Sequence, residues 1–190
     1  VSNIYAQKSK KKSKKKIPSL QASVKFQSFY DNNVLKYSEK YLDRFINLED
    51  EGRFHINTYD DVVFAPSLVL TSKYYFMKRK ATQLKFFAKN NTYMNNSIKN
   101  WNYFYLRLEQ YYHKRGKIGF QYDYIPDFYI RHYRDDDYTS FMGYVPGSFK
   151  RMAFSKENYR LYIQHRIQKT TVKLNLNYTQ YFYNVHYIEY

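Results

Sequence analysis

Residues 116–133, GKIGFQYDYIPDFYIRHY, alternate between two kinds of side chain along their whole length. The even positions, from Ile118 to His132, are almost all apolar or aromatic, and the odd positions, from Lys117 to Arg131, are mostly polar with charges of both signs. A period of two is typical of a strand whose two faces meet different environments. The segment exceeds the about five or six residues of an ordinary strand and the about 9–11 of a tilted strand that crosses a bilayer. Its apolar face therefore contacts either a protein core or lipid.

The composition narrows the class of protein. A chain of 190 residues is long enough for one domain, and the absence of Cys excludes a disulfide scaffold and thiolate metal sites. Mean hydropathy is low, and no run of about 18 apolar residues is present, so the sequence predicts no transmembrane helix. Alternating transmembrane strands remain compatible with low hydropathy, because averaging over a window hides their apolar face.

The net charge of +16 is concentrated in part near the N-terminus. Residues 1–6, VSNIYA, are interpreted as the remnant of a secretory signal that ends at Ala6, and residues 8–16, KSKKKSKKK, as a disordered tail. Residues 1–19 are therefore assigned as signal remnant and Lys-rich tail. The tail is either an arm for nucleic acid, phospholipid headgroups or cell-wall polymer, or a solvated terminus; positive charge after a cleavage site argues against export.

The rest of the chain, residues 20–190, is predicted to be a single all-β domain. Alternating segments predict strands over 20–30, 62–76, 82–89, 102–109, 116–133, 159–167 and 172–182. The connections between them are 31–61, 77–81, 90–99, 113–116, 134–157 and 168–171. Within the long loop 31–61, apolar residues at helical spacing predict a short helix between Val34 and Leu48.

Short connections follow longer ones throughout this series, with 31–61 and 134–157 the two longest. Every second connection is tight, as in an antiparallel up-and-down transmembrane β-barrel with short turns on one side of the membrane and longer loops on the other. A soluble β-sandwich does not predict this alternation.

Charge is segregated between the two faces of the predicted strands. The apolar faces contain no Lys, Arg, Asp or Glu, and only His132 and His165 are titratable there. A Lys or Arg that faces lipid at the bilayer midplane costs roughly 2–4 kcal/mol, so this segregation favours lipid, although a soluble barrel with an apolar interior would show it in reverse. The opposite faces, predicted to face a lumen, contain ten basic and three acidic residues: Lys25, Lys73, Lys85, Lys89, Arg107, Lys117, Arg131, Arg160, Arg166, Lys173, Glu109, Asp123 and Asp127.

Aromatic residues gather near the predicted strand ends, where transmembrane barrels have girdles at the membrane interfaces. Tyr74, Trp101, Tyr112 and Phe182 are the predicted interface aromatics. The alternative is that Tyr is simply favoured in strands.

Over residues 20–183 the chain resembles bacterial outer-membrane β-barrel proteins as a class, including its turn Tyr30-Asp31-Asn32-Asn33. The resemblance implies a bacterial outer-membrane location, contact with outer-membrane lipid and lipopolysaccharide, and insertion by the barrel-assembly machinery. Single-chain barrels of this class have an even number of strands, eight or more, whereas seven are visible here, so at least one more strand is expected.

Two functions from different classes remain open at this stage. The first is a small pore or a structural or surface barrel, whose basic lumen either favours anions or is plugged by its own side chains. The second is a soluble basic β-protein that binds nucleic acid through the Lys-rich tail and aromatic side chains. We favour the first and no nucleic-acid partner, because the apolar aromatic faces lack interleaved Lys and Arg; the oligomeric state is not predicted.

No residue pattern predicts catalysis or a cofactor. The five histidines are scattered, without metal-ligand spacing. Asp135, Asp136 and Asp137 in the loop 134–157 are weak candidates for cation binding, with a solvated loop as the alternative.

Overall fold

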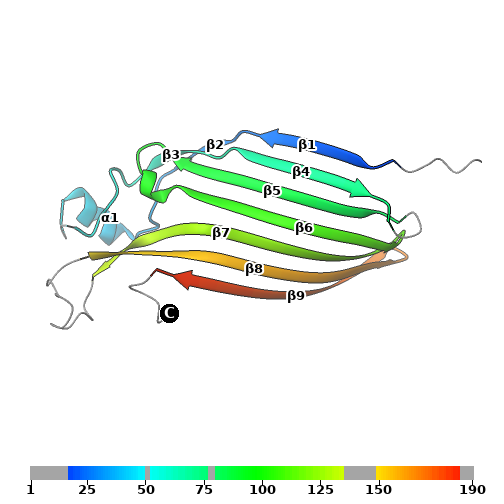
Figure 1. Cartoon of the computed structure of the whole chain (residues 1–190). Helices are drawn as coiled ribbons and strands as arrows, with labels where there is room; N and C mark the ends of the chain where they lie inside the picture. The colour runs from blue at the N-terminus through cyan, green and yellow to red at the C-terminus, as the bar shows by residue number, and fades with distance from the viewer. Residues whose placement is uncertain (1–16, 50–51, 77–79, 135–148, 185–190) are drawn as a thin grey trace, which may run out of the picture.

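The computed structural model describes residues 17–49, 52–76, 80–134 and 149–184, which form one long, curved antiparallel sheet with a helix at one end (Figure 1). The predicted signal remnant and Lys-rich tail, apart from residues 17–19, and the candidate cation ligands Asp135, Asp136 and Asp137 lie outside the described residues. The predicted all-β, antiparallel architecture is confirmed over the described part of the chain.

The elements follow one another along the sheet with few crossovers. In chain order they are β1 (Ser19–Lys25), β2 (Ser28–Asp31), α1 (Glu39–Ile46), β3 (Asp61–Phe64), β4 (Ser67–Tyr74), β5 (Thr82–Tyr93), the 3-10 turn η1 (Ser97–Lys99), β6 (Trp101–His113), β7 (Gly116–Arg134), β8 (Phe149–Ile167) and β9 (Thr170–Tyr183). Strands are paired in the order β1-β4-β5-β6-β7-β8-β9, while β2 pairs with β3 and β3 also pairs with β5.

The first two predicted strands are each broken into two. β1 and β2 together occupy the predicted segment 20–30, and β3 and β4 occupy 62–76, with Ala65 and Pro66 at the second break. Proline has no N–H to give to a ladder and is found at strand starts or bulges. The Ala65 N–H donates to the Gln27 carbonyl (2.8 Å), so the two breaks lie side by side and bend the sheet together.

Further boundaries differ from the sequence prediction. β5 ends at Tyr93, so residues 90–93 of the predicted connection 90–99 belong to a strand. β8 begins at Phe149, so residues 149–157 of the predicted loop 134–157 belong to a strand. The predicted helix between Val34 and Leu48 is present in a shorter form, as α1.

The alternation of β7 does not continue to its end. The pairing with β8 shifts register between Ile125 and Phe128 and again between Tyr129 and Arg131, as at β-bulges. The first extra residue moves the following side chains to the other face, and the second moves them back, so the predicted faces are displaced around Phe128 and Tyr129. His132, predicted on the apolar face, is buried and stacks on His55.

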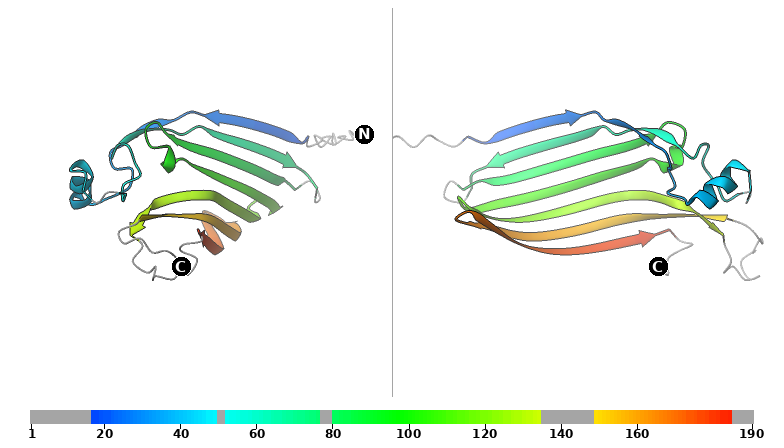
Figure 2. Two further views of the ribbon diagram at one scale, coloured as in Figure 1. Left: turned by 60° about the vertical axis from the view of Figure 1, so that its left-hand side comes forward. Right: turned by 180° about the vertical axis from the view of Figure 1, so that it is seen from behind.

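The two ends of the sheet differ. The tight turns that join β6 to β7 and β8 to β9 lie at one end, and α1, η1 and the β2–β3 pair lie at the other (Figure 2). β1 and β9 are the two edges, and the sheet formed by the described residues is not closed.

None of the described helices is long and apolar enough to cross a membrane.

A small hydrophobic core lies at the α1 end. We call residues 32–49 and 52–60, which include α1, the cap. Val34, Leu35 and Tyr37 of the cap pack against Val63, Tyr93 and Tyr129 of the strands, and all six are buried. The Asp61 carboxylate accepts backbone N–H hydrogen bonds from Met94, Asn95 and Asn96, at 2.8–3.1 Å. The core and this carboxylate hold the cap and the β5–β6 connection against the end of the sheet.

Candidate functional site

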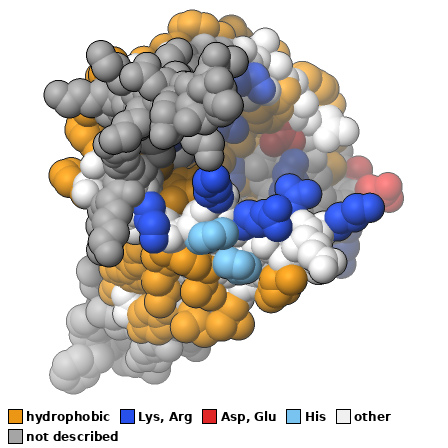
Figure 3. All heavy atoms as spheres, turned by 90° about the vertical axis from the view of Figure 1, so that its right-hand side faces the viewer, with side chains coloured by type: hydrophobic (Ala, Val, Ile, Leu, Met, Phe, Trp, Pro, Cys, Tyr) orange, Lys and Arg blue, Asp and Glu red, His pale blue; other side chains and the backbone are white. Residues whose placement is uncertain are grey.

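The two faces of the sheet differ in exposure on the central strands. Cross-strand pairing aligns Leu108, Phe120, Leu161 and Leu176 in one row on the apolar face, where Phe120 is 44% exposed, Leu161 45% and Leu176 62%. On the polar face, Glu109 is 5% exposed, Gln121 3% and Asp123 8%. In the end view, Lys and Arg side chains cross the middle of the molecule, with hydrophobic side chains above and below them (Figure 3). On the central strands the polar face is therefore the sheltered face.

The Asp123 carboxylate is the centre of one polar network. It accepts hydrogen bonds from the Tyr103 hydroxyl, from Gln121 Nε2 at 2.6 Å and from Asn158 Nδ2 at 2.9 Å. Arg107 Nε donates in turn to Gln121 Oε1 at 2.6 Å, and the Thr179 hydroxyl donates to Asn158 Oδ1 at 2.8 Å. The network crosses β6, β7, β8 and β9, and it satisfies the buried carboxylate, as burial of a charge requires.

A second network surrounds Glu109. Its Oε1 accepts hydrogen bonds from Lys117 Nζ at 2.8 Å and from the Tyr162 hydroxyl. The Nζ atom of Lys173 lies 4.8 Å from the ring centroid of Tyr162, a cation–π distance. The Tyr162 ring lies against Gly119, where a Cβ atom would collide with it. Because Gly119 has no side chain, Tyr162 of β8 can extend across β7 to Glu109 of β6.

Basic side chains outnumber acidic ones on the polar face. Glu109 and Asp123 are the acids that the strand register places there, and both are engaged in the networks above. The third predicted lumen acid, Asp127, lies within the first bulge of β7 and pairs with Arg151 at 2.6 Å near the α1 end. Arg131 lies at the second bulge. The other predicted lumen residues lie where the strand register is regular: Lys25, Lys73, Lys85, Lys89, Arg107, Lys117, Arg160, Arg166, Lys173, Glu109 and Asp123.

The polar face leaves little open space beside the Asp123 network. A cavity of about 180 Å³ is lined in part by Tyr103, Lys156 and Arg160. Binding sites for small organic ligands are usually about 300–1,000 Å³, so this hollow suits water or a small ion better than a metabolite.

Sequence reasoning missed the neutral members of these networks: Tyr103, Gln121, Asn158, Tyr162 and Gly119. Charges were singled out because they are costly to bury, whereas an amide or a phenol carries no such signal by itself. These residues can be identified once it is known which residues lie opposite on the neighbouring strands. Gln121, for example, lies opposite both Arg107 and Arg160.

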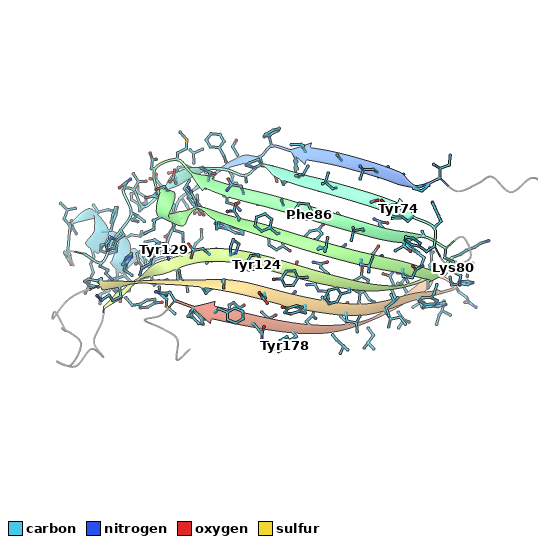
Figure 4. The ribbon with its side chains drawn as sticks, in the orientation of Figure 1. Tyr74, Lys80, Phe86, Tyr124, Tyr129 and Tyr178 are labelled. Carbon is cyan, nitrogen blue, oxygen red and sulfur yellow. The ribbon has the colours of Figure 1, made fainter. Side chains whose placement is uncertain are left out.

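The four predicted interface aromatics have different environments. Tyr74 and Phe182 are exposed, at 43% and 50%. Trp101 packs edge-on against Phe128, and the Tyr112 hydroxyl lies 3.0 Å from His165 Nδ1. Figure 4 shows Tyr74 toward the tight-turn end, and Phe86, Tyr124 and Tyr178 along the middle of the sheet. Aromatic residues are thus not confined to the strand ends.

The structure brings together two histidines that the sequence keeps far apart. The rings of His55, in the cap, and His132, on β7, are stacked with 3.5 Å between their centroids. His132 Nδ1 is 2.8 Å from the Tyr129 hydroxyl. No group of three or more potential metal ligands occurs among the described residues, so this pair lacks the further ligands of a protein metal site.

The comparisons with known proteins found no match: no protein-family model, no curated protein and no solved structure matches this chain.

Proposed function

We propose that this chain forms the wall of a bacterial outer-membrane β-barrel, with its apolar face toward lipid and its polar face toward the interior. One observation supports the proposal above all others: on the central strands the apolar row is exposed, while Glu109, Gln121 and Asp123 of the polar face are buried and hydrogen-bonded. Burying a Leu or Phe side chain contributes about 1.5–3 kcal/mol, so a row of exposed apolar side chains on neighbouring strands is unfavourable in water and favourable in a bilayer.

The directions of the two edge strands restrict which element can close such a barrel. Six antiparallel pairings lead from β1 to β9, so these two edge strands run in the same direction (Figure 1). An element that is antiparallel to both edges must therefore contain an odd number of strands. One such strand added to the seven on the main path gives eight, an even number as in single-chain bacterial barrels. Closure is required because lipid does not tolerate an unpaired strand edge.

We further propose that the interior is filled by side chains, which makes the barrel structural or surface-presenting. Barrels of about eight strands have interiors just wide enough for side chains to fill. The networks around Glu109 and Asp123 are side chains of this kind. If water does pass through, the excess of Lys and Arg on the polar face favours anions.

Detergent-dependent folding of the full chain tests this proposal. The chain is refolded with and without micelles, and far-UV circular dichroism and heat-modifiable gel migration are recorded. We expect a strand spectrum and a compact band only with micelles. A monomeric β-protein in plain buffer would overturn the membrane proposal.

One observation favours the alternative of nucleic-acid binding. On the polar face, Phe87 and Tyr105 are stacked with 5.0 Å between their ring centroids, and Arg107 lies 5.2 Å from the Tyr105 ring centroid. Stacked aromatics beside cations are what single-stranded nucleic acid requires. A chain that folds in buffer should then bind single-stranded RNA with an affinity that falls steeply with salt, and F87A and Y105A should weaken that binding.

A further inference from the structure

Basic side chains surround Tyr37 at the junction between the cap and β7. The Cζ atom of Arg131, on β7, lies 4.7 Å from the Tyr37 ring centroid. The guanidinium of Arg53, in the cap, is close enough to act on the Tyr37 hydroxyl, but the two groups do not have hydrogen-bond geometry. Lys99 of η1 is close enough to repel Arg131, and its side chain is buried, with the residue 8% exposed.

Two polar atoms at this junction are buried without a hydrogen-bond partner among the described residues. They are the hydroxyl of Tyr37, a residue 5% exposed, and Nε of Arg131. Buried polar groups in folded proteins nearly always have a partner, so each such atom needs an explanation. Both atoms can donate a hydrogen bond.

The described carboxylates near the junction are engaged elsewhere. Asp31 pairs with Lys36 at 2.8 Å, and Asp61 accepts the backbone N–H groups of the β5–β6 connection. Among the described residues, no ion pair includes Arg131 or Lys99. Lys99 Nζ donates instead to the Tyr129 carbonyl oxygen at 3.0 Å. Asp31 also attracts Lys99, but the basic side chains Arg131, Arg53 and Lys99 outnumber it, so the described part of the junction has excess positive charge.

We propose that Tyr37 and Arg131 form a binding site for a phosphate group, with Lys99 adding positive potential beside it. Arginine and lysine only donate hydrogen bonds, and a phenol can donate one, so the three side chains suit a ligand that only accepts. A phosphate offers several acceptor oxygens and negative charge, and guanidinium groups bind it with strong charge-assisted hydrogen bonds. The phosphate is either inorganic or the headgroup of a lipid, and the two sources are separable by experiment.

The position of the site agrees with either source. It lies at the α1 end of the sheet, where Tyr129 is labelled in Figure 4, away from the tight turns. In the proposed barrel this end carries the longer connections and lies at a membrane surface, where lipid phosphates are found. The site itself does not require a membrane, because its donors belong to the cap and to the ends of the strands.

The test measures phosphate binding to the full folded chain. The protein is folded in octyl glucoside, an uncharged detergent without phosphate, or in buffer if it folds there. Inorganic phosphate is titrated by calorimetry and by ³¹P NMR. We expect saturable binding to the wild-type chain, weakened about tenfold or more in R131Q, because hydrogen bonds to charged groups contribute about 1.5–3 kcal/mol.

Two further variants make the result specific. Y37F removes only the hydroxyl and retains the ring that packs on Tyr41 and Phe54, so it should weaken binding while the circular dichroism spectrum is unchanged. R166Q makes the same Arg-to-Gln change on β8, near the tight turn at the far end of the sheet from the cap, and should bind as the wild type does. Y37F also serves if R131Q does not fold.

Lipid phosphate forms the second arm. Phosphatidic acid is mixed into the micelles at the same phosphate concentration as in the inorganic titration. Tighter binding of the lipid assigns the site to headgroups, and equal binding assigns it to free phosphate. The proposal is overturned if the wild-type chain binds neither form saturably, or if R166Q loses as much affinity as R131Q, since the attraction would then come from net charge alone.

Discussion

The ring of Tyr162 lies against Gly119 on the neighbouring strand, and its hydroxyl reaches Glu109 one strand further. A side chain of β8 is thereby linked to β6 across β7. This contact depends on the absence of a Cβ atom at position 119 and makes the sheltered face of the sheet a cross-linked layer.

Replacing Gly119 with Ala should destabilise the fold. The added Cβ would collide with the Tyr162 ring, and overpacking of this kind costs typically about 1–3 kcal/mol. The denaturant midpoint of G119A measures the loss. The double variant G119A/Y162A should lose less than the sum of the two single changes, because removing the ring removes the collision. Additive losses would show that the ring does not depend on position 119.

Removing the charge partner of Glu109 should cost more than removing an unpaired lysine of the same face. The Glu109 side chain is 7% exposed and pairs with Lys117, so K117M leaves a buried carboxylate without its cation. Breaking a buried pair in this way costs about 3 kcal/mol or more. K173M is the matched control, since Lys173 makes no ion pair with a described carboxylate, and it should cost under about 1 kcal/mol. Equal losses would mean that the Glu109–Lys117 ion pair makes no specific contribution to the free energy of unfolding.

Alternation in the sequence predicted much of the sheet because a period of two is a local property. The predicted segments 20–30 and 62–76 each span two observed strands, and the other five correspond to β5 to β9. What alternation did not predict depends on the partner strand. The bulges after Ile125 and the start of β8 at Phe149 are set by cross-strand pairing and by packing under the cap.

The candidate site was predictable only in its charged residues. Glu109, Asp123 and most of the basic residues follow from parity along each strand. The contacts of Tyr103 and Tyr162 require knowledge of which residues lie opposite, and the meeting of His55 with His132 requires the path of the cap. Such relations join segments distant in sequence, so no local pattern contains them.

Lys99 should make stability depend on pH in a defined window. Burial is the main cause that lowers the pKa of Lys99 from 10.5 to about 8. Below pH 8 both the folded and the unfolded chain carry the proton, and the full cost of burying the charge is present. Between about 8 and 10.5 the unfolded chain binds more protons, so stability rises with pH, by at most about 1.4 kcal/mol per pH unit.

The variant K99M, which has no titratable group at this position, isolates the effect. In phosphate-free buffer, denaturant midpoints from pH 7 to 9.5 should rise for the wild type relative to K99M. The range stops below the region where tyrosines of the unfolded chain ionise, at about pH 10. Parallel curves for the two proteins would show that Lys99 stays charged when the chain folds.

A charge placed on the apolar face distinguishes lipid from water as its surroundings. Leu176 is 62% exposed, and its neighbour Asn175 lies on the polar face opposite Tyr162. In water, a change at so exposed a leucine should alter stability by no more than about 0.5 kcal/mol, because surface substitutions usually do. In a bilayer, L176K should cost about 2–4 kcal/mol if the residue lies near the midplane. N175K, which adds the same charge one residue away, should cost much less. The comparison is made by denaturant titration in lipid vesicles, and equal, small effects of the two changes would place the apolar face in water.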